Sequence, residues 1–292
     1  MYSNDELDNL PKLNKMIPKH IQDVVSIGTF VILMPLGFLI HLFYIMPTWW
    51  PAFGEAWVIR TSIFGFLAFN VYVNWFRMIQ TGPNGSKAVL VDIVKSGYRF
   101  CHSCRANAPP RAYHCPVCDA CQFRRDHHCS FGAVCIGHFN QRYFVGAILN
   151  LFALQTVLSL YAWEFLWLNM DGQFTILKAW QIVLPHLALV ARILSFYQFV
   201  VVLFYACNMT VLLFTLYLIA AQAFCIWQGQ TRVEYLLDVH AYQIGVFGNL
   251  KECLGSRWPL IALSPFIPSP LPSDGTSFSV REIPELSRAK DM

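Results

Sequence analysis

The pattern of apolar and polar positions divides the chain into long hydrophobic segments joined by polar connections. A bilayer core needs a helix of about 20 predominantly apolar residues. Four segments meet this requirement, at residues 24–46, 57–78, 143–165 and 198–222. Pro35 falls inside the first segment, but membrane helices tolerate proline. The pattern predicts an all-α integral membrane protein with four transmembrane helices, the first of them an uncleaved anchor.

A fifth apolar stretch, at residues 176–190, is short and contains Lys178, Pro185 and His186. We interpret it as an amphipathic or interfacial helix within a loop at 166–197. The alternative is a fifth span, which would move the C-terminus to the other side of the membrane.

Basic residues predict the orientation, because loops that carry lysine and arginine stay cytosolic. The loop at 79–142 is rich in both, the N-terminal segment 1–23 contains three lysines, and residues 47–56 contain neither. Both termini and the 79–142 loop are therefore expected in the cytosol, and the 166–197 loop in the lumen. After the fourth span, residues 228–262 are expected to fold against the membrane. Residues 263–292 are rich in proline and serine and read as a disordered tail.

Composition agrees with this assignment. The chain of 292 residues is 56% hydrophobic and 13% charged, which is unlike an ordinary soluble domain. Its net charge of +4 suggests basic loops beside lipid head groups and gives no reason to expect nucleic-acid binding. A transporter or channel is disfavoured, because the sequence has neither an internal repeat nor acid/base pairs within the spans.

Candidate chemistry is concentrated in the loop between the second and third spans. Seven of the ten cysteines lie between Cys101 and Cys135, interspersed with histidines. Closely spaced Cys-x-x-Cys pairs mixed with histidine indicate metal ligation in a reducing compartment, and zinc takes four such ligands per ion. Leaving out His102 and His138, the loop offers seven cysteines and three histidines, which is two more groups than two ions need.

The residue types alone leave open which groups are spare. Asp126, His127 and Cys129 form a chemically sensible set, since a carboxylate can orient a histidine that takes the proton of a thiol. The alternative is a purely structural zinc module without a reactive thiol.

The segment from Cys101 to Phe144 resembles the DHHC protein S-acyltransferases, a family of integral membrane palmitoyltransferases. The likeness extends to Pro109 and Arg111 and to the run Ile136-Gly137-x2-Asn140. Three further family motifs are matched to different degrees. Thr231-Arg232-Val233-Glu234 resembles a Thr-Thr-x-Glu motif, Tyr242-x2-Gly245-x3-Asn249-x5-Gly255 resembles the C-terminal aromatic/asparagine motif, and Thr81 to Asn84 faintly echo an Asp-Pro-Gly motif.

The resemblance implies a cysteine-rich domain with a core at 101–140, containing short β-hairpins and two structural Zn²⁺ ions. One ion would bind Cys101, Cys104, His114 and Cys121, and the other Cys115, Cys118, His128 and Cys135. Cys129 would be the acylated nucleophile, with His127 as its base and Asp126 orienting His127. The implied reaction transfers a long-chain acyl group, such as palmitoyl, from acyl-CoA to cytosolic cysteines of membrane-associated proteins, in the endoplasmic reticulum or Golgi.

Acyl-CoA contacts have only weak candidates in the sequence. Arg111, Arg124 and Arg125 are basic groups that could meet the CoA phosphates, with a solvated loop face as the alternative, and Phe131 offers an aromatic face.

The sequence departs from the family between the nucleophile and the last ligand. The family usually has Pro-Trp-Val-Asn-Asn there, whereas this chain has Ser130 to Val134, and Arg232 replaces the second threonine of the Thr-Thr-x-Glu motif. These changes motivate an alternative function, a catalytically weak or inactive membrane adaptor held together by two structural zinc ions.

Overall fold

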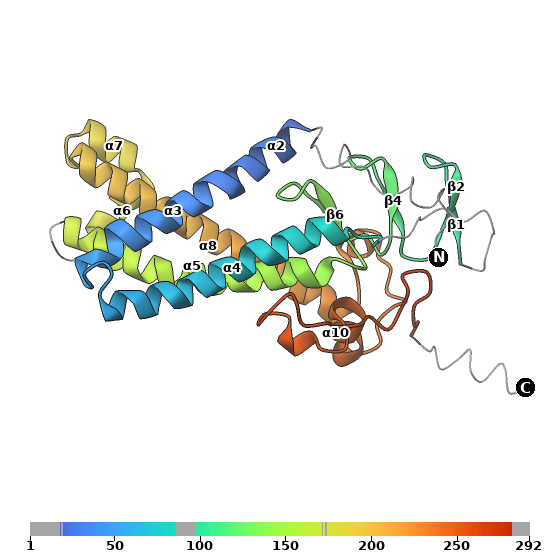
Figure 1. Ribbon diagram of the computed structural model, residues 1–292. Helices are drawn as coiled ribbons and strands as arrows, with labels where there is room; N and C mark the ends of the chain where they lie inside the picture. The colour runs from blue at the N-terminus through green and yellow to red at the C-terminus, as the bar shows by residue number, and fades with distance from the viewer. Residues whose placement is uncertain (1–17, 19, 86–96, 171, 173, 282–292) are drawn as a thin grey trace, which may run out of the picture. The chain divides into compact units, whose positions relative to one another are not determined.

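The computed structural model describes residue 18 and residues 20–85, 97–170, 172 and 174–281. Most of the predicted N-terminal segment 1–23, part of the 79–142 loop and the end of the predicted tail lie outside the described residues. Four helical stretches are long and apolar enough to cross a membrane, at 21–48, 55–81, 141–169 and 196–228 (Figure 1). This confirms the predicted four membrane helices, and each is longer than the sequence pattern suggested.

The first of these stretches is not a uniform α-helix. It runs through α2 (Ile21–Gly28), η2 (Thr29–Leu33), α3 (Met34–Ile40), η3 (His41–Ile45) and η4 (Met46–Thr48), and η2 and η3 are π-helical. Pro35 has no N–H to donate to the preceding turn, and η2 lies directly before it. The other three are the continuous helices α4 (Glu55–Thr81), α5 (Gln141–Asn169) and α8 (Phe196–Gln228).

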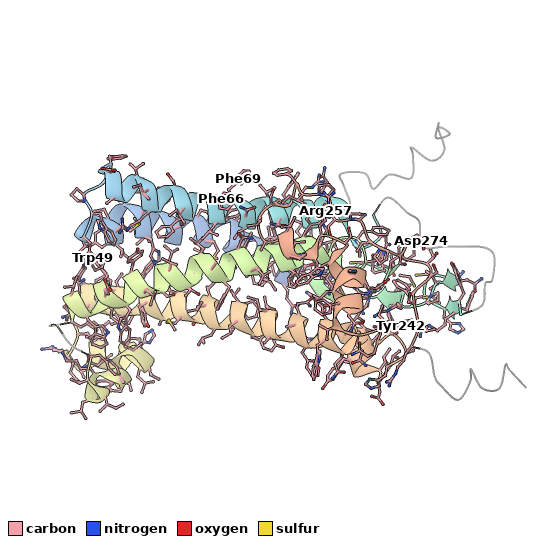
Figure 2. All side chains as sticks on the ribbon, turned by 90° about the horizontal axis from the view of Figure 1, so that it is seen from below. Trp49, Phe66, Phe69, Tyr242, Arg257 and Asp274 are labelled. Carbon is pink, nitrogen blue, oxygen red and sulfur yellow. The ribbon has the colours of Figure 1, made fainter. Side chains whose placement is uncertain are left out.

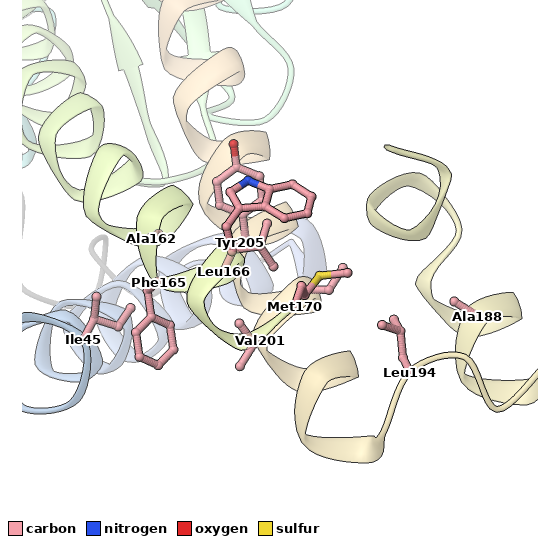
Figure 3. Packing of buried hydrophobic residues seen from close by; sticks show 11 residues of the cluster. Ile45, Ala162, Phe165, Leu166, Met170, Ala188, Leu194, Val201 and Tyr205 are labelled. Carbon is pink, nitrogen blue, oxygen red and sulfur yellow. The ribbon is translucent and has the colours of Figure 1, made fainter. Parts of the chain in front are cut away.

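The described residues form two compact units. The helical unit comprises residues 32–71 and 148–220, and the Cys-rich unit comprises residues up to 31, 72–147 and from 221 onward. In the helical unit, η3, α5 and α8 contribute to a core in which Ile45 faces Phe165, with Val201 and Tyr205 contributed by α8 (Figure 3). Helix α4 packs in a second core, where Phe64 joins Leu42 and Leu154. Phe66 and Phe69 of α4 point outward and are more than half exposed, as lipid-facing side chains would be (Figure 2).

The stretch at 176–190 contains η5 (Ile176–Lys178), α6 (Ala179–Val183) and α7 (Pro185–Val190). None of these three is long enough to span a bilayer. A fifth span is therefore not found among the described residues, and the interfacial interpretation remains the prediction.

The Cys-rich unit is built on three antiparallel hairpins, as the family resemblance implied. Their strands are β1 (Arg99–Cys101) with β2 (Ala106–Ala108), β3 (Tyr113–Cys115) with β4 (Ala120–Gln122), and β5 (His127–Cys129) with β6 (Val134–Ile136). Such short strands bury too little apolar surface to be stable on their own. A small core around Phe123, Ala108 and Ala112 supports the first two hairpins.

Asn140 and Gly137 connect the third hairpin to α5. The Asn140 side chain is fully buried, accepts a hydrogen bond from Gly137 N, and donates to the carbonyls of Cys135 and Met78. A Cβ on Gly137 would lie 2.4 Å from the carbonyl oxygen of Phe123, so only glycine fits there. These contacts explain why the Ile-Gly-x2-Asn run follows the last cysteine of the loop.

The predicted disordered tail requires a correction. Residues 263–281 follow α10 (Val246–Leu254) and η6 (Trp258–Leu260) and make specific contacts within the Cys-rich unit. Ser269 Oγ donates to Leu254 O at 2.8 Å, Arg142 donates to carbonyls of Pro265, Ile267 and Ser269, and Phe278 stacks edge-on against His138. Proline and serine composition signalled the lack of regular structure, but it could not reveal this packing.

Candidate active site and metal clusters

Two groups of four side chains come together in the Cys-rich unit. Cys101, Cys104, His114 and Cys121 form the first cluster, and Cys115, Cys118, His128 and Cys135 form the second. Within each cluster the ligand atoms lie within 4.8 Å of one another. Three thiols and one imidazole at such distances fit a tetrahedral metal ion with sulfur and nitrogen ligands.

Hairpin register explains why the two clusters interleave along the chain. His114 lies directly opposite Cys121, and His128 lies directly opposite Cys135. Successive side chains in a strand point to opposite faces. Cys115, which follows His114, therefore leaves the first cluster and joins the second.

The same alternation separates Cys129 from the metal clusters. His128 faces its cluster through Nδ1, which lies 3.3 Å from Cys118 Sγ. His127 and Cys129 flank His128 in β5 and so share the opposite face of the strand. Cys129 is buried and belongs to neither cluster.

The Asp126 carboxylate is fully buried and is hydrogen-bonded on both oxygens. His127 Nδ1 lies 2.7 Å from Oδ2, Gln222 Nε2 donates to the same oxygen at 2.8 Å, and the backbone N–H of Arg232 donates to Oδ1 at 2.8 Å. Burial opposes ionisation of Asp126, but these donors outweigh it and hold its pKa below the usual value.

Burial also lowers the pKa of His127, yet its interactions with Asp126 and Cys129 raise that pKa to about 9. A histidine held in this way by a carboxylate can take the proton of a neighbouring thiol, as in cysteine enzymes. The geometry therefore offers an acid–histidine–thiol arrangement at the surface of β5 opposite the second cluster.

A chain of buried side chains continues from Asp126 through Gln222 and Gln141 to Arg124. Gln141 Nε2 donates to Gln222 Oε1 at 2.9 Å, and Arg124 donates to Gln141 Oε1 at 2.5 Å. The Arg124 guanidinium can only donate hydrogen bonds and the Asp126 carboxylate can only accept them. The orientation of both glutamine amides, with oxygen toward Arg124 and nitrogen toward Asp126, is therefore determined. We call these four residues the amide relay. Sequence reasoning missed both glutamines, although a glutamine at the end of an apolar span, such as Gln222, is an available signal.

The Thr231 to Glu234 motif is structurally intact despite Arg232. Thr231 and Glu234 form a reciprocal capping box at the start of α9 (Arg232–Leu236). Glu234 also accepts two hydrogen bonds from Arg111, at 2.7 and 2.6 Å, and the Arg111 guanidinium lies 4.2 Å above the Tyr242 ring. The motif thereby joins the Cys-rich loop to the segment after α8.

Two of the three arginines named as candidates for CoA phosphate contacts bind other groups of the protein. Arg111 and Arg124 are almost completely buried and bonded within the protein, to Glu234 and to the amide relay respectively. A solvated loop face is therefore wrong for both, and their contact with CoA phosphates stays a prediction. Arg125 is half-buried and lies beside the thiols of Cys115 and Cys135. Phe131 is half-buried, its carbonyl accepts from Trp75 Nε1 at 2.7 Å, and its ring contacts Phe30.

Four membrane helices with a Cys/His-rich domain between the second and third define a class of membrane protein, and comparison with known proteins identifies its family. The family model described as DHHC palmitoyltransferase matches residues 94–239. The chain belongs to this family and is a multi-pass membrane protein.

Similar proteins occur in animals and plants. The chain is 33% identical over 218 residues to "Probable palmitoyltransferase ZDHHC24" of Danio rerio, covering 74% of this chain and 73% of that one. It is 32% identical over 183 residues to the Mus musculus protein of the same name, covering 62% of this chain and 64% of that one. "Probable protein S-acyltransferase 1" of Arabidopsis thaliana is 32% identical over 178 residues, covering 60% and 48%. The match thus spans a little less than two thirds of the mouse relative.

Proposed function

We propose that this protein is a membrane-bound protein S-acyltransferase that moves a long-chain acyl group, such as palmitoyl, from acyl-CoA to cysteine thiols of proteins. The observation that carries the proposal is the position of Cys129. It shares a strand face with His127, whereas its neighbour His128 points to the other face, and it lies outside both metal clusters. Relatives named palmitoyltransferase and protein S-acyltransferase support the same reaction class.

We further propose that both clusters bind structural Zn²⁺ through the residues grouped above, because three thiolates and one imidazole suit zinc. A bound ion would hold the short hairpins together and would contribute no chemistry at the thioester. This role matches the small size of the local apolar core, which could not fix the position of β5 unaided.

The first chemical step forms an acyl-enzyme. His127 takes the proton of Cys129, and the Cys129 sulfur attacks the thioester carbonyl carbon of acyl-CoA. A new carbon–sulfur bond forms as the bond to the CoA sulfur breaks, and the departing CoA thiolate takes a proton from solvent, while His127 keeps the proton of Cys129. Asp126 accepts a hydrogen bond from His127 Nδ1, which leaves Nε2 free to face the thiol.

In the second step, the thiolate of a substrate cysteine attacks the carbonyl carbon of acyl-Cys129. The acyl group leaves the enzyme, and Cys129 regains its proton from His127. Each step exchanges one thioester for another, so the protein contributes mainly by placing the groups and activating the thiol.

The proposed setting is the cytosolic face of the endoplasmic reticulum or Golgi membrane, where acyl-CoA and cytosolic cysteines are both accessible. Basic residues of the Cys-rich loop support the cytosolic placement. The substrates would be membrane-associated proteins whose cysteines reach this face.

The test is autoacylation of the full-length protein in detergent with labelled palmitoyl-CoA. Cys129→Ser is expected to lower formation of the hydroxylamine-sensitive adduct at least about 100-fold, because the nucleophile is lost. Cys207→Ser is the matched control, since Cys207 is an exposed cysteine in α8 and should leave the rate unchanged. An equal adduct on the Cys129→Ser protein would refute the assignment.

Transfer from the acyl-enzyme to a cysteine-containing peptide separates the enzyme from a zinc-organised adaptor. An adaptor would retain both metal ions and produce no acylated peptide. The departures that suggest an adaptor lie at Ser130 to Val134, and the Trp75 bond holds the backbone of that turn in place.

A further inference from the structure

The two metal clusters differ in what holds the outer nitrogen of their histidine. In the first cluster, His114 Nε2 lies 3.9 Å from Asp119 Oδ1, and the Asp119 side chain is 92% exposed. In the second, His128 Nε2 lies 3.2 Å from Asp23 Oδ2, and the Asp23 side chain is 5% exposed. Among the residues that the structure describes, only the second histidine therefore has a buried carboxylate within hydrogen-bonding distance.

This geometry fixes the tautomer of His128. Its Nδ1 faces the thiols of Cys115, Cys118 and Cys135 at 3.3 to 3.9 Å. A nitrogen that binds a metal ion must offer a lone pair, so the proton resides on Nε2, where the Asp23 carboxylate accepts it. Carboxylates in this position orient the ring and increase its basicity, and losing one commonly weakens metal binding 10- to 100-fold.

Asp23 comes from the first membrane-spanning stretch, 105 residues before His128. It lies in the first turn of α2, where the helix dipole favours a negative charge. Seven residues further on, Phe30 contacts the turn of the same hairpin, with its ring 6.4 Å from the ring of Phe131. The Tyr72 hydroxyl donates to Phe30 O and fixes that second contact.

We propose that Asp23 is a positioning residue that orients His128 as a metal ligand and thereby attaches the start of the first span to the hairpin that carries Cys129. The inference rests on the proposed metal loading. The start of the first span would then help to hold the Cys-rich domain, because Asp23 and Phe30 contact the β5–β6 hairpin on either side of Cys129.

The experiment measures zinc bound to the full-length protein in detergent and its initial rate of release to a chromogenic chelator. Asp23→Ala should release zinc about 10-fold faster or more, and Asp23→Asn, which keeps an acceptor oxygen but not the charge, should be intermediate. Asp119→Asn is the matched control at the first cluster and should match the unmodified protein. Equal release rates for Asp23→Ala and the unmodified protein would overturn the proposal.

The same substitution in a second variant distinguishes a specific effect on His128 from a general folding defect. In a His128→Cys protein the ligand no longer needs an oriented ring, so adding Asp23→Ala should not accelerate release further. If Asp23→Ala accelerates release equally in both backgrounds, Asp23 acts through general stability and the inference is wrong. An unmodified protein without two zinc ions per chain would instead refute the proposed metal loading, which keeps the two failures distinguishable.

Discussion

Each oxygen of the Asp126 carboxylate has a donor supplied by a distant part of the chain. Gln222 is the last polar group of the relay before Asp126, and it donates to the oxygen that also binds His127. Without this donor the carboxylate loses part of what lowers its pKa and fixes its rotamer. The rate of acyl-enzyme formation should therefore depend on a residue that never touches the substrate.

We expect Gln222→Leu to slow autoacylation about 10-fold, because His127 is then held less firmly in its productive tautomer and orientation. The slowing should be accompanied by a changed pH–rate profile, which loss of packing alone would not produce. Initial rates across pH 6 to 9, with saturating palmitoyl-CoA, measure both effects.

Gln198→Leu is the control on the same helix, since Gln198 bonds to Asn169 and Ser195 outside the relay. An unchanged rate and pH profile for Gln222→Leu would show that the relay does not position Asp126.

At the scale of elements, the segment after η6 packs onto the Cys-rich unit around His138. The His138 ring is buried, its Nε2 bonds to Ser273 O at 2.9 Å, and Phe139 and Phe278 flank it. Glycine is favoured at position 275 for two reasons. Its φ of +88° suits glycine, and a Cβ there would lie 3.0 Å from the His138 ring. This part of the chain is thus attached through a titratable side chain.

Stability should fall in acid because of His138. The pKa of His138 is lowered to about 4, mainly by burial and also by Arg124 and Arg111, while Ser273 and Asp274 act in the opposite sense. The unfolded chain, with a pKa near 6.5, binds the proton first, so the stabilisation is complete above about pH 6.5 and is lost as pH falls toward 4. The loss is on the order of 3 kcal/mol at most.

Melting temperatures of the detergent-solubilised protein between pH 4 and 7.5 measure this dependence. His138→Phe should flatten it, whereas His240→Gln should not, because His240 is exposed. Identical pH dependence in the His138→Phe protein would contradict the assignment.

At the scale of the whole molecule, the features that depend on local sequence pattern were predicted, namely the spans and the groups of metal ligands. Hydrophobic length identified the four spans, and ligand spacing with the family resemblance named the two groups of four that the structure brings together. Burial of Arg111 and Arg124 was not predictable, because their partners Glu234 and Gln141 lie 123 and 17 residues away. The contact of Asp23 with His128 was not predictable for the same reason, since the two residues are 105 positions apart.

Chelation provides a test at this scale. Because both clusters take ligands from the β3–β4 hairpin, we expect that loss of one zinc ion speeds loss of the other, so chains with a single ion should scarcely accumulate. Autoacylation should decline in step with zinc content. Native mass spectrometry and autoacylation assays on the same chelator time course measure both, and a fully active population with one ion per chain would contradict this expectation.

The interleaved order of the ligands also has a consequence for synthesis on the ribosome. Cys101, Cys104, Cys115 and Cys118 leave the exit tunnel before Cys121, and together they already make up a complete set of four thiols. A nascent chain can therefore trap an ion in the wrong set, and reaching the native arrangement requires a later exchange of ligands once Cys121, His128 and Cys135 emerge. Timing of metal delivery during translation would then decide how much of the protein matures.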